Sequence, residues 1–313
     1  MALRKNQFAL VLGSGGARGL AHIGVIKCLE ENHIPIHFVV GTSIGAFIGG
    51  VYASGINARV MEEVVCSMDK ITMAKILMPK FSASGIVNNA RVKKFITKLI
   101  GEKRIEKLPI EFRAVSTDLI TGEEVVFDKG LLVDAILASI AIPALFQPVY
   151  HQGRYLVDGG LCNPLPISVA HRVHDQYSIA VNVSPNPERI RKRIQKKTHE
   201  KDRRKKNTQP LWLFNLLKER GYTFSMDTFK IPSFGTTKRH DIYFPSALRV
   251  TLQSISISAH NLILQHLKQD QPDVLISPKI EEYDMLEFYK GAEIIRCGYD
   301  AAKSALPKIH SLL

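Results

Sequence analysis

The sequence lacks most of the features that mark secreted, metal-binding or repetitive proteins. Its four cysteines are widely scattered and form no C-x-x-C or other metal-ligand spacing, so we expect reduced, mostly buried thiols and no metal. No internal repeat or low-complexity segment is visible. The N-terminal MALRKNQFALVLG has only about six apolar residues before a glycine-rich turn, whereas a secretory signal needs an apolar region of about 7–15 residues. These absences predict a cytoplasmic protein without a signal peptide.

Charge is also absent from a long part of the chain. No residue from Phe38 to Asn57 is charged, and the formal net charge of +13 comes mainly from one other segment. Between Arg189 and Lys206 eleven basic residues stand against two acidic ones, a net +9, which leaves +4 for the rest of the 313 residues. The basicity therefore belongs to one segment and is not a property of the whole fold.

The remaining residues alternate between strand and helix patterns, as a parallel sheet covered by helices requires. The predicted strands are residues 8–12, 36–40, 110–116, 124–127, 154–157 and 179–183. The predicted helices are residues 21–31, 44 to about 54, 58–68, 90–100, 131–139, 246–267 and 285–305. We expect one domain over residues 1–313, with a core of about 7–185, a basic surface excursion of about 186–210 and a C-terminal helical part of about 211–313.

The stretch VVGTSIGAFIGGVYASGI, residues 39–56, satisfies two incompatible patterns. Gly41, Ser43 and Gly45 form G-x-S-x-G, the strand-to-helix turn that exposes a nucleophilic serine. Gly41, Gly45 and Gly49 also repeat as G-x-x-x-G, which is typical of packed transmembrane helices. A membrane helix needs about 20 apolar residues, and this stretch reaches that length only when its glycines, serines and threonine are counted. The sequence therefore favours the serine turn.

A second glycine-rich turn, GSGGARG at residues 13–19, also lies between a predicted strand and a predicted helix. A dinucleotide-binding loop would need an acidic residue at the end of the second strand, where Gly41-Thr42-Ser43 stands instead. An oxyanion hole would use the backbone N–H groups of the loop, which parallel strands place at the same sheet edge as Ser43. We favour the oxyanion hole. Arg18, the one charge of the loop, either steers an anionic headgroup or pairs with a carboxylate, and we favour the pairing.

Four motifs in this order resemble those of the patatin-like phospholipases: GSGGARG (13–19), GTSIGA (41–46), ASIAIP (138–143) and DGG (158–160). The resemblance covers roughly residues 7–185. It implies an α/β fold with three α/β/α layers around a central, mainly parallel sheet. It also implies a serine acyl hydrolase of phospholipase A or lysophospholipase type, which hydrolyses a lipid ester without calcium or another cofactor.

The resemblance also implies roles for individual residues. Ser43 matches the family's nucleophile and Asp158 its general base, which together form a serine–aspartate dyad. Gly15 and Gly16 match the oxyanion hole. Ser14 departs from the pattern, since many members have glycine there, and this puts the geometry of one donor in doubt. The other motif residues are expected to support the site: Gly13, Ser14, Arg18, Gly19, Gly41, Gly45, Gly159 and Gly160.

A catalytic histidine is the alternative to the dyad. His22 lies three residues beyond the glycine-rich turn, and His151 precedes the strand that leads to Asp158. A histidine at helical spacing is more often a packed or capping residue, so we favour the dyad. Val157 and Leu161 suggest an apolar setting for Asp158, and burial there would raise the carboxyl pKa from its reference value near 3.9 toward that of a useful base.

The basic segment is followed by PLWLFNLLKERGY, which holds the chain's single tryptophan. Cationic residues beside a Trp/Leu/Phe helix suit an interfacial membrane contact, so residues 189–220 are predicted to bind anionic membranes. Alternatively, the apolar residues belong to the core and the charges solvate a loop. Residues 189–206 contain no Phe, Tyr or Trp to stack on a base, so no specific nucleic acid is expected. A non-catalytic lipid- or nucleic-acid-binding protein that keeps the fold is the alternative to the enzyme.

Overall fold

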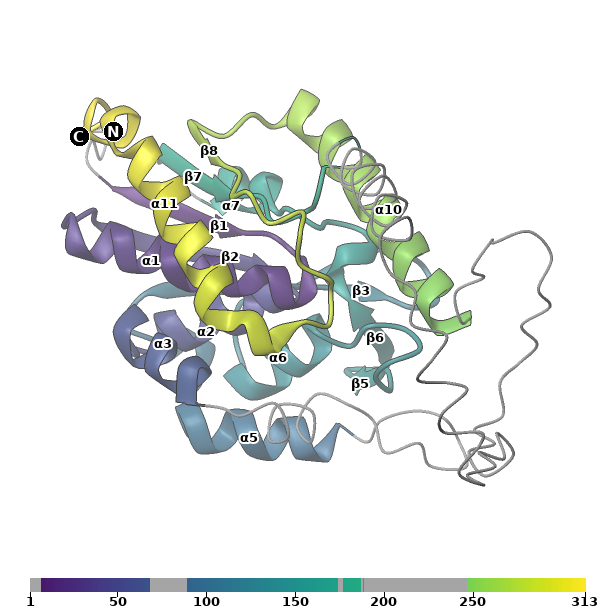
Figure 1. Ribbon diagram of the computed structural model, residues 1–313. Coiled ribbons are helices and arrows are strands. Elements are labelled where there is room, and N and C mark those ends of the chain that lie inside the picture. The colour runs from purple at the N-terminus through teal and green to yellow at the C-terminus, as the bar shows by residue number, and fades with distance from the viewer. Residues whose placement is uncertain (1–6, 68–88, 174–176, 187, 189–246) are drawn as a thin grey trace, which may run out of the picture. The chain divides into compact units, whose positions relative to one another are not determined.

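The computed structural model describes residues 7–67, 89–173, 177–186, 188 and 247–313 (Figure 1). The chain divides into two compact units, one formed by residues 1–185 with 253–313 and the other by residues 186–252. Most of the second unit lies outside the described residues. The single domain expected from the sequence therefore stays a prediction, and so does the membrane contact of residues 189–220.

Eight strands of the described residues form one sheet. They are β1 (Phe8–Leu12), β2 (Ile36–Thr42), β3 (Glu111–Asp118), β4 (Glu124–Phe127), β5 (Val149–His151), β6 (Arg154–Asp158), β7 (Tyr177–Val181) and β8 (Val274–Ile276). The α-helices described are α1 (Ala21–Glu31), α2 (Ile44–Ala53), α3 (Ala58–Ser67), α5 (Ala90–Ile100), α6 (Leu132–Ser139), α7 (Ile167–Val173), α10 (Ala247–Gln269) and α11 (Gly291–His310). Short 3-10 helices are η1 (Gly16–Leu20), η2 (Ile105–Lys107), η3 (Gly159–Leu161) and η4 (Phe288–Lys290).

The sheet is parallel through its centre and antiparallel at one end. β3, β2, β1, β7 and β8 pair in that order, and every pair is parallel. β4 and β6 each run antiparallel to β3, and β5 runs antiparallel to β6. This confirms the mainly parallel sheet predicted from the alternating strand and helix patterns, since parallel strands need a crossover between them.

Helices cover both faces of this sheet. Alternate residues of β1 point to opposite faces, as the pleat requires. Phe8, Leu10 and Leu12 pack with α1, α2, α3, α5, α6 and α11, whereas Ala9 and Val11 pack with α7 and with Ile263 of α10. Figure 1 shows α11 running alongside α1 on the first of these faces. The three α/β/α layers implied by the resemblance are therefore confirmed.

The close packing of α1 against α11 depends on two glycines. A Cβ atom at Gly24 would lie 1.8 Å from the carbonyl oxygen of Ile295, and one at Gly298 would lie 1.9 Å from that of Ala21. Any larger residue at either position would push the two helices apart. The two glycines thus set the distance between α11 and α1, the helix that follows the glycine-rich turn.

The structure differs from the sequence prediction mainly at short elements. The three-residue strands β5 and β8 and the helix α7 were not predicted, because such short runs carry little periodic signal. β7 starts two residues earlier than predicted. α11 starts at Gly291 rather than residue 285, since Asp284 N–H donates to the Glu287 carboxylate in a turn that precedes η4.

The transmembrane interpretation of residues 39–56 is wrong. Residues 36–42 form the buried strand β2, and the following helix α2 has only ten residues, eight of them buried. Among the helices of the described residues, none combines the length and apolar character that crossing a membrane requires.

The pairing of β3 brings two distant parts of the chain together. Residues 114–115 of β3 pair with both β2 and β4, and residues 116–117 pair with both β4 and β6. β2 and β6 therefore occupy the same edge of β3, end to end. Thr42 stands opposite Val115, and Asp158 stands opposite the next residue, Ser116. The last residue of β6 thus abuts the residue that follows β2.

Candidate active site

Ser43, the predicted nucleophile, occupies a sharp turn between β2 and α2. Its φ of 57° and ψ of −124° lie outside the regions that residues with a side chain normally occupy, at a cost of about 1–3 kcal/mol. The turn is so tight that a Cβ at Gly41 would lie 2.3 Å from the Gly45 carbonyl oxygen, and one at Gly45 would lie 2.1 Å from that of Leu12. Both glycines predicted to support the site are therefore required for close approach of the backbone.

A buried serine on another element holds this strained turn. Ser139, the last residue of α6, accepts a hydrogen bond from Ser43 N–H at 2.9 Å and donates one to the Val115 carbonyl at 2.6 Å. Its hydroxyl hydrogen is thus directed at Val115, and its lone pair faces Ser43. The sequence marked residues 138–143 as a motif, but the pattern alone did not indicate this contact.

Asp158, the predicted general base, is within hydrogen-bonding distance of Ser43. Ser43 Oγ donates to Asp158 Oδ2 at 2.5 Å, and Gly160 N–H donates to Asp158 Oδ1 at 2.7 Å. Gly159 permits this arrangement, since a Cβ there would lie 2.2 Å from the Val115 carbonyl oxygen. Both oxygens of the carboxylate are therefore oriented, one of them by the serine hydroxyl.

The environment of Asp158 suits a base that works near neutral pH. Its side chain is buried, and burial raises its pKa from 3.8 to about 6, against the smaller lowering effect of the hydrogen bonds from Ser43 and Gly160. No Lys, Arg or His of the described residues forms an ion pair with it. At pH 7 the carboxylate is charged and close to its pKa, which is the condition that favours proton transfer.

The glycine-rich turn presents two unpaired N–H groups. Gly13 and Ser14 donate their backbone N–H to the carbonyls of Val181 and Pro164, and Ala17 donates to Met285. Within the described part of the chain, no acceptor is found for the N–H groups of Gly15 and Gly16. These are the two residues predicted to form the oxyanion hole. Ser14 N–H is already bonded, so it is not a free donor.

The conformation of this turn requires its glycines. Gly16 has a φ of 60°, and a Cβ there would lie 2.5 Å from the Met285 side chain. A Cβ at Gly19 would lie 2.1 Å from the side chain of Ile44, so this glycine lets the turn pack directly on the start of α2. Ile44 N–H is a third group without an acceptor in the described chain, because Ile44 is the first residue of α2 and has no intrahelical partner.

Neither histidine considered from the sequence contacts the dyad. His22 is completely buried, and its Nε2 donates to the Gly13 carbonyl at 2.8 Å. Burial lowers the pKa of His22 to about 4, so the ring is neutral at pH 7. His151 lies on β5, where its ring packs at a tilt of 51° against Phe127 with centroids 4.8 Å apart. His22 thus stabilises the glycine-rich turn from behind.

Arg18 lies in the turn without the carboxylate partner that we favoured. Its Nε donates to the Gly15 carbonyl at 3.3 Å, and no described Asp or Glu approaches it within ion-pair distance. Burial lowers the pKa of Arg18 to about 10, opposed by the weaker influence of Asp284 and then Glu281. The side chain is therefore a buried cation close to Ser43.

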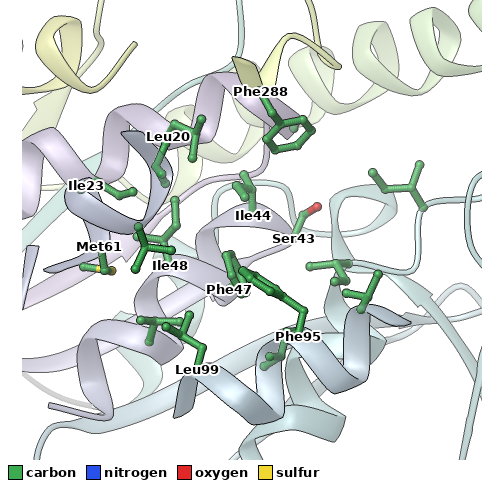
Figure 2. A pocket seen from close by; sticks show the side chains of 18 of the residues that line it. Leu20, Ile23, Ser43, Ile44, Phe47, Ile48, Met61, Phe95, Leu99 and Phe288 are labelled. Carbon is green, nitrogen blue, oxygen red and sulfur yellow. The ribbon is translucent and has the colours of Figure 1, made fainter. Parts of the chain in front are cut away.

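Two cavities meet at Ser43. The larger has a volume of about 140 Å³ and follows one face of α2, formed by Ile44, Phe47, Ile48 and Val51. Figure 2 shows Ile44, Phe47 and Ile48 together with Met61 of α3, Phe95 and Leu99 of α5 and Phe288. Ser43 is the single polar residue among its described lining residues. We call this the apolar cavity.

The smaller cavity has a volume of about 30 Å³ and is also lined by Ser43. It is lined by Asp158, Gly160, Arg18, Ser14 and Gly15, and by residues of α10 and its surroundings: Ser184, Pro185, Ile255, Ser256, Ala259, Ile142 and Met285. We call this the polar cavity. No cluster of three or more His, Cys, Asp or Glu side chains suited to a metal occurs among the described residues.

The curated proteins that this chain resembles include NTE family proteins and a patatin-like phospholipase. An uncharacterised NTE family protein of Mycobacterium tuberculosis is 42% identical over 176 residues, which cover 56% of this chain and 49% of the relative. Patatin-like phospholipase domain-containing protein 6 of Mus musculus is 33% identical over 192 residues, 59% of this chain and 14% of the relative. Lysophospholipase NTE1 of Meyerozyma guilliermondii is 28% identical over 305 residues, 95% of this chain and 19% of the relative. The matched region thus spans about half or less of these curated relatives.

Among solved structures, VipD from Legionella pneumophila aligns with a TM-score of 0.47 and 15% identity, covering 98% of this chain and 67% of that chain. The family description "Patatin-like phospholipase" matches residues 10–171, just over half of the 313 residues. That range includes both glycine-bearing turns, Ser139 and Asp158. The chain belongs to the patatin-like phospholipase family.

Proposed function

We propose that this protein is a serine acyl hydrolase that cleaves lipid esters, of phospholipase A or lysophospholipase type. The observation that carries the proposal is the 2.5 Å hydrogen bond from Ser43 Oγ to the buried Asp158 carboxylate, next to an apolar cavity that reaches the same serine. Family membership supports lipid hydrolysis, and the name of the Meyerozyma guilliermondii relative supports a lysophospholipid substrate.

In the first half of the reaction, Ser43 Oγ attacks the carbonyl carbon of the ester while its proton passes to Asp158 Oδ2. The carbonyl oxygen becomes an oxyanion, and the unpaired N–H groups of Gly15, Gly16 and Ile44 are the donors available to it. Collapse of this tetrahedral species breaks the bond to the leaving alcohol, which takes the proton from Asp158. The acyl group remains on Ser43 as an ester.

In the second half, water replaces the alcohol. Asp158 accepts a proton from the water as its oxygen attacks the acyl carbon, and the same N–H groups stabilise the second oxyanion. Expulsion of Ser43 Oγ, which recovers its proton from Asp158, releases the fatty acid. No other titratable side chain is needed, which agrees with the buried, neutral His22 bonded to Gly13.

The apolar cavity suits the acyl chain. A buried chain gains about 0.8 kcal/mol for each methylene removed from water, so even a few methylenes hold the ester carbonyl beside Ser43. The lining residues Ile44, Phe47, Ile48 and Val51 repeat at helical spacing along α2, and residue 51 lies about 10 Å along the helix axis from residue 44. This length accommodates a fatty acyl chain rather than an acetyl group.

A fluorophosphonate probe tests the proposal, because only an activated serine reacts with it. We expect the folded wild-type protein to be labelled at Ser43, and the Ser43→Ala variant to remain unlabelled. Labelling of Asp158→Asn should be slower by orders of magnitude, since the base is lost. A folded wild-type protein that does not react would support the non-catalytic binding protein instead.

A further inference from the structure

A buried cation with unused hydrogen-bond donors lies beside the proposed nucleophile. Arg18 is 7% exposed and lines the polar cavity together with Ser43 and Asp158. A guanidinium has five N–H donors. In the described part of the chain one of them is used, by the 3.3 Å bond from Nε to the Gly15 carbonyl. Its two terminal amino groups have no partner among the described residues and are available to bind a ligand.

The nearby carboxylates do not fill this role. Asp284 and Glu281 attract Arg18, but neither forms an ion pair with it, and Asp284 is exposed to solvent, which weakens its attraction. A buried charge without a partner is costly, by an amount that a bound anion can recover. The fork of the guanidinium suits the oxygens of a phosphate or carboxylate group.

The position of Asp158 indicates which part of a substrate lies here. Asp158 lines the polar cavity and is absent from the apolar one. In the proposed reaction Asp158 returns its proton to the leaving alcohol, so that alcohol lies on the polar side of Ser43. The acyl chain then lies on the apolar side. Arg18 therefore faces whatever is attached to the alcohol.

We infer that Arg18 binds the phosphate group of a phospholipid or lysophospholipid whose acyl chain lies in the apolar cavity. This inference rests on the proposed function, and it assigns the polar cavity to the binding of the leaving group. The polar cavity, at about 30 Å³, has room for little more than one water or a phosphate oxygen. The polar cavity therefore binds the phosphate group itself, and the rest of the headgroup lies outside the cavity.

The test compares two esters, of which one carries a phosphocholine group and the other a free hydroxyl in its place. Lauroyl-lysophosphatidylcholine and monolauroylglycerol carry the same acyl chain, and kcat/KM is measured for both with wild type, Arg18→Gln and Arg18→Lys. We expect wild type to prefer the lysophospholipid and Arg18→Gln to lose at least about tenfold of that preference. Arg18→Lys should keep part of the preference, because it retains the charge without the fork.

Arg113→Gln is the matched control. Arg113 is also largely buried, but it pairs with Glu111 at the far end of β3, so its substitution should leave the preference unchanged. Equal losses on both esters in Arg18→Gln would contradict the inference and give Arg18 a purely structural role on the Gly15 carbonyl. If wild type hydrolyses neither ester and no simpler ester, the proposed function itself fails, which is a separate result.

If Arg18→Gln does not fold, wild type alone decides the question. Glycerophosphocholine should competitively inhibit hydrolysis of p-nitrophenyl laurate, and glycerol at the same concentration should not. Equal effects of the two compounds would contradict the inference. Inhibition by inorganic phosphate combined with no preference for the lysophospholipid would also contradict it, because the ligand would then be free phosphate.

Discussion

The apolar and polar cavities share Ser43 and Ile142 but differ in size and in the chemistry of their other lining residues. The apolar cavity is several times larger, and Ser43 is the one polar residue among its described lining residues. The polar cavity holds the buried carboxylate of Asp158 and the buried guanidinium of Arg18. In the proposed function, proton transfer and charge thus belong to the polar cavity and hydrocarbon to the apolar cavity.

In the proposed reaction, this difference would orient an ester before any chemistry occurs. A chain in the polar cavity would desolvate Arg18 and Asp158 further, and a phosphate in the apolar cavity would meet no cationic side chain among its described lining residues. Only one of the two orientations satisfies both halves of the substrate. Asp158 shares the polar cavity with Arg18, but the two side chains form no ion pair, and burial raises the pKa of Asp158 to about 6.

Loss of either residue of the proposed dyad should have the largest effect. Ser43→Ala and Asp158→Asn each remove half of the dyad, and we expect kcat to fall by at least about 10³-fold on charged and neutral esters alike. His22→Ala, normalised to folded protein, should keep most of the activity because the hydrogen bond of the His22 ring goes to the Gly13 carbonyl and not to Ser43 or Asp158. Steady-state kinetics with both ester classes measure this. A His22→Ala variant that folds but is as inactive as Asp158→Asn would overturn the dyad.

The next largest effect should come from Ser139, which touches neither cavity. Ser139→Ala leaves Ser43 N–H without an acceptor and frees the strained turn to relax, so we expect kcat to fall by about 10–100-fold with a smaller change in KM. Ser139→Thr, which keeps the hydroxyl, should recover part of it.

Ser178→Ala is the matched control for this prediction, since Ser178 is equally buried and hydrogen-bonded, but to Asp273 at the other side of the sheet. It should lower the melting temperature without lowering kcat. If Ser139→Ala behaves like Ser178→Ala, Ser139 contributes to stability alone.

Much of this arrangement follows from local sequence, because its parts obey local rules. The strand at 8–12 and the helices at 21–31 and 90–100 have the predicted bounds, since their apolar spacing is regular and turn residues flank them. The glycines around Ser43 have steric reasons that act within a few residues or against the adjacent strand. Such features need no knowledge of the rest of the chain.

The parts that could not be predicted depend on long-range pairing. β2 and β6 meet end to end because both pair with β3, and nothing near Asp158 in the sequence encodes that register. The contact of Ser139 with Ser43 likewise joins residues 96 positions apart. Arg18 was expected to pair with a carboxylate, but burial among residues from several elements leaves it without one in the described chain. The two cavities arise from the same long-range packing.

Filling the apolar cavity should change the substrate preference more modestly. Val51→Phe places a ring at the end of the α2 face that is farther from Ser43, so we expect kcat/KM for long-chain p-nitrophenyl esters to fall about tenfold more than for short-chain esters. Val60→Phe is the control, because Val60 is exposed on α3 and does not line the cavity. An unchanged chain-length profile in Val51→Phe would mean that the acyl chain lies elsewhere.

The smallest effect should be on stability, and it has the opposite sign to the effect on activity. The folded protein holds the pKa of Asp158 at about 6, above its ordinary 3.8, so folding favours the protonated carboxyl. That favourable contribution is complete below about pH 4 and is lost as the pH rises through 6, because the buried group must then carry a charge. Asp158→Asn removes the charge.

We therefore expect Asp158→Asn to unfold at a higher temperature than wild type above pH 6. Its free energy of unfolding should exceed that of wild type by on the order of 1–3 kcal/mol there, and the difference should disappear near pH 4. Thermal denaturation at a series of pH values measures it. A constant difference across that range would mean that Asp158 is not strained by its burial. The hydrogen bonds from Ser43 and Gly160 would then offset the cost of burying the Asp158 charge, and the polar cavity would be a less apolar environment than the burial of Asp158 indicates.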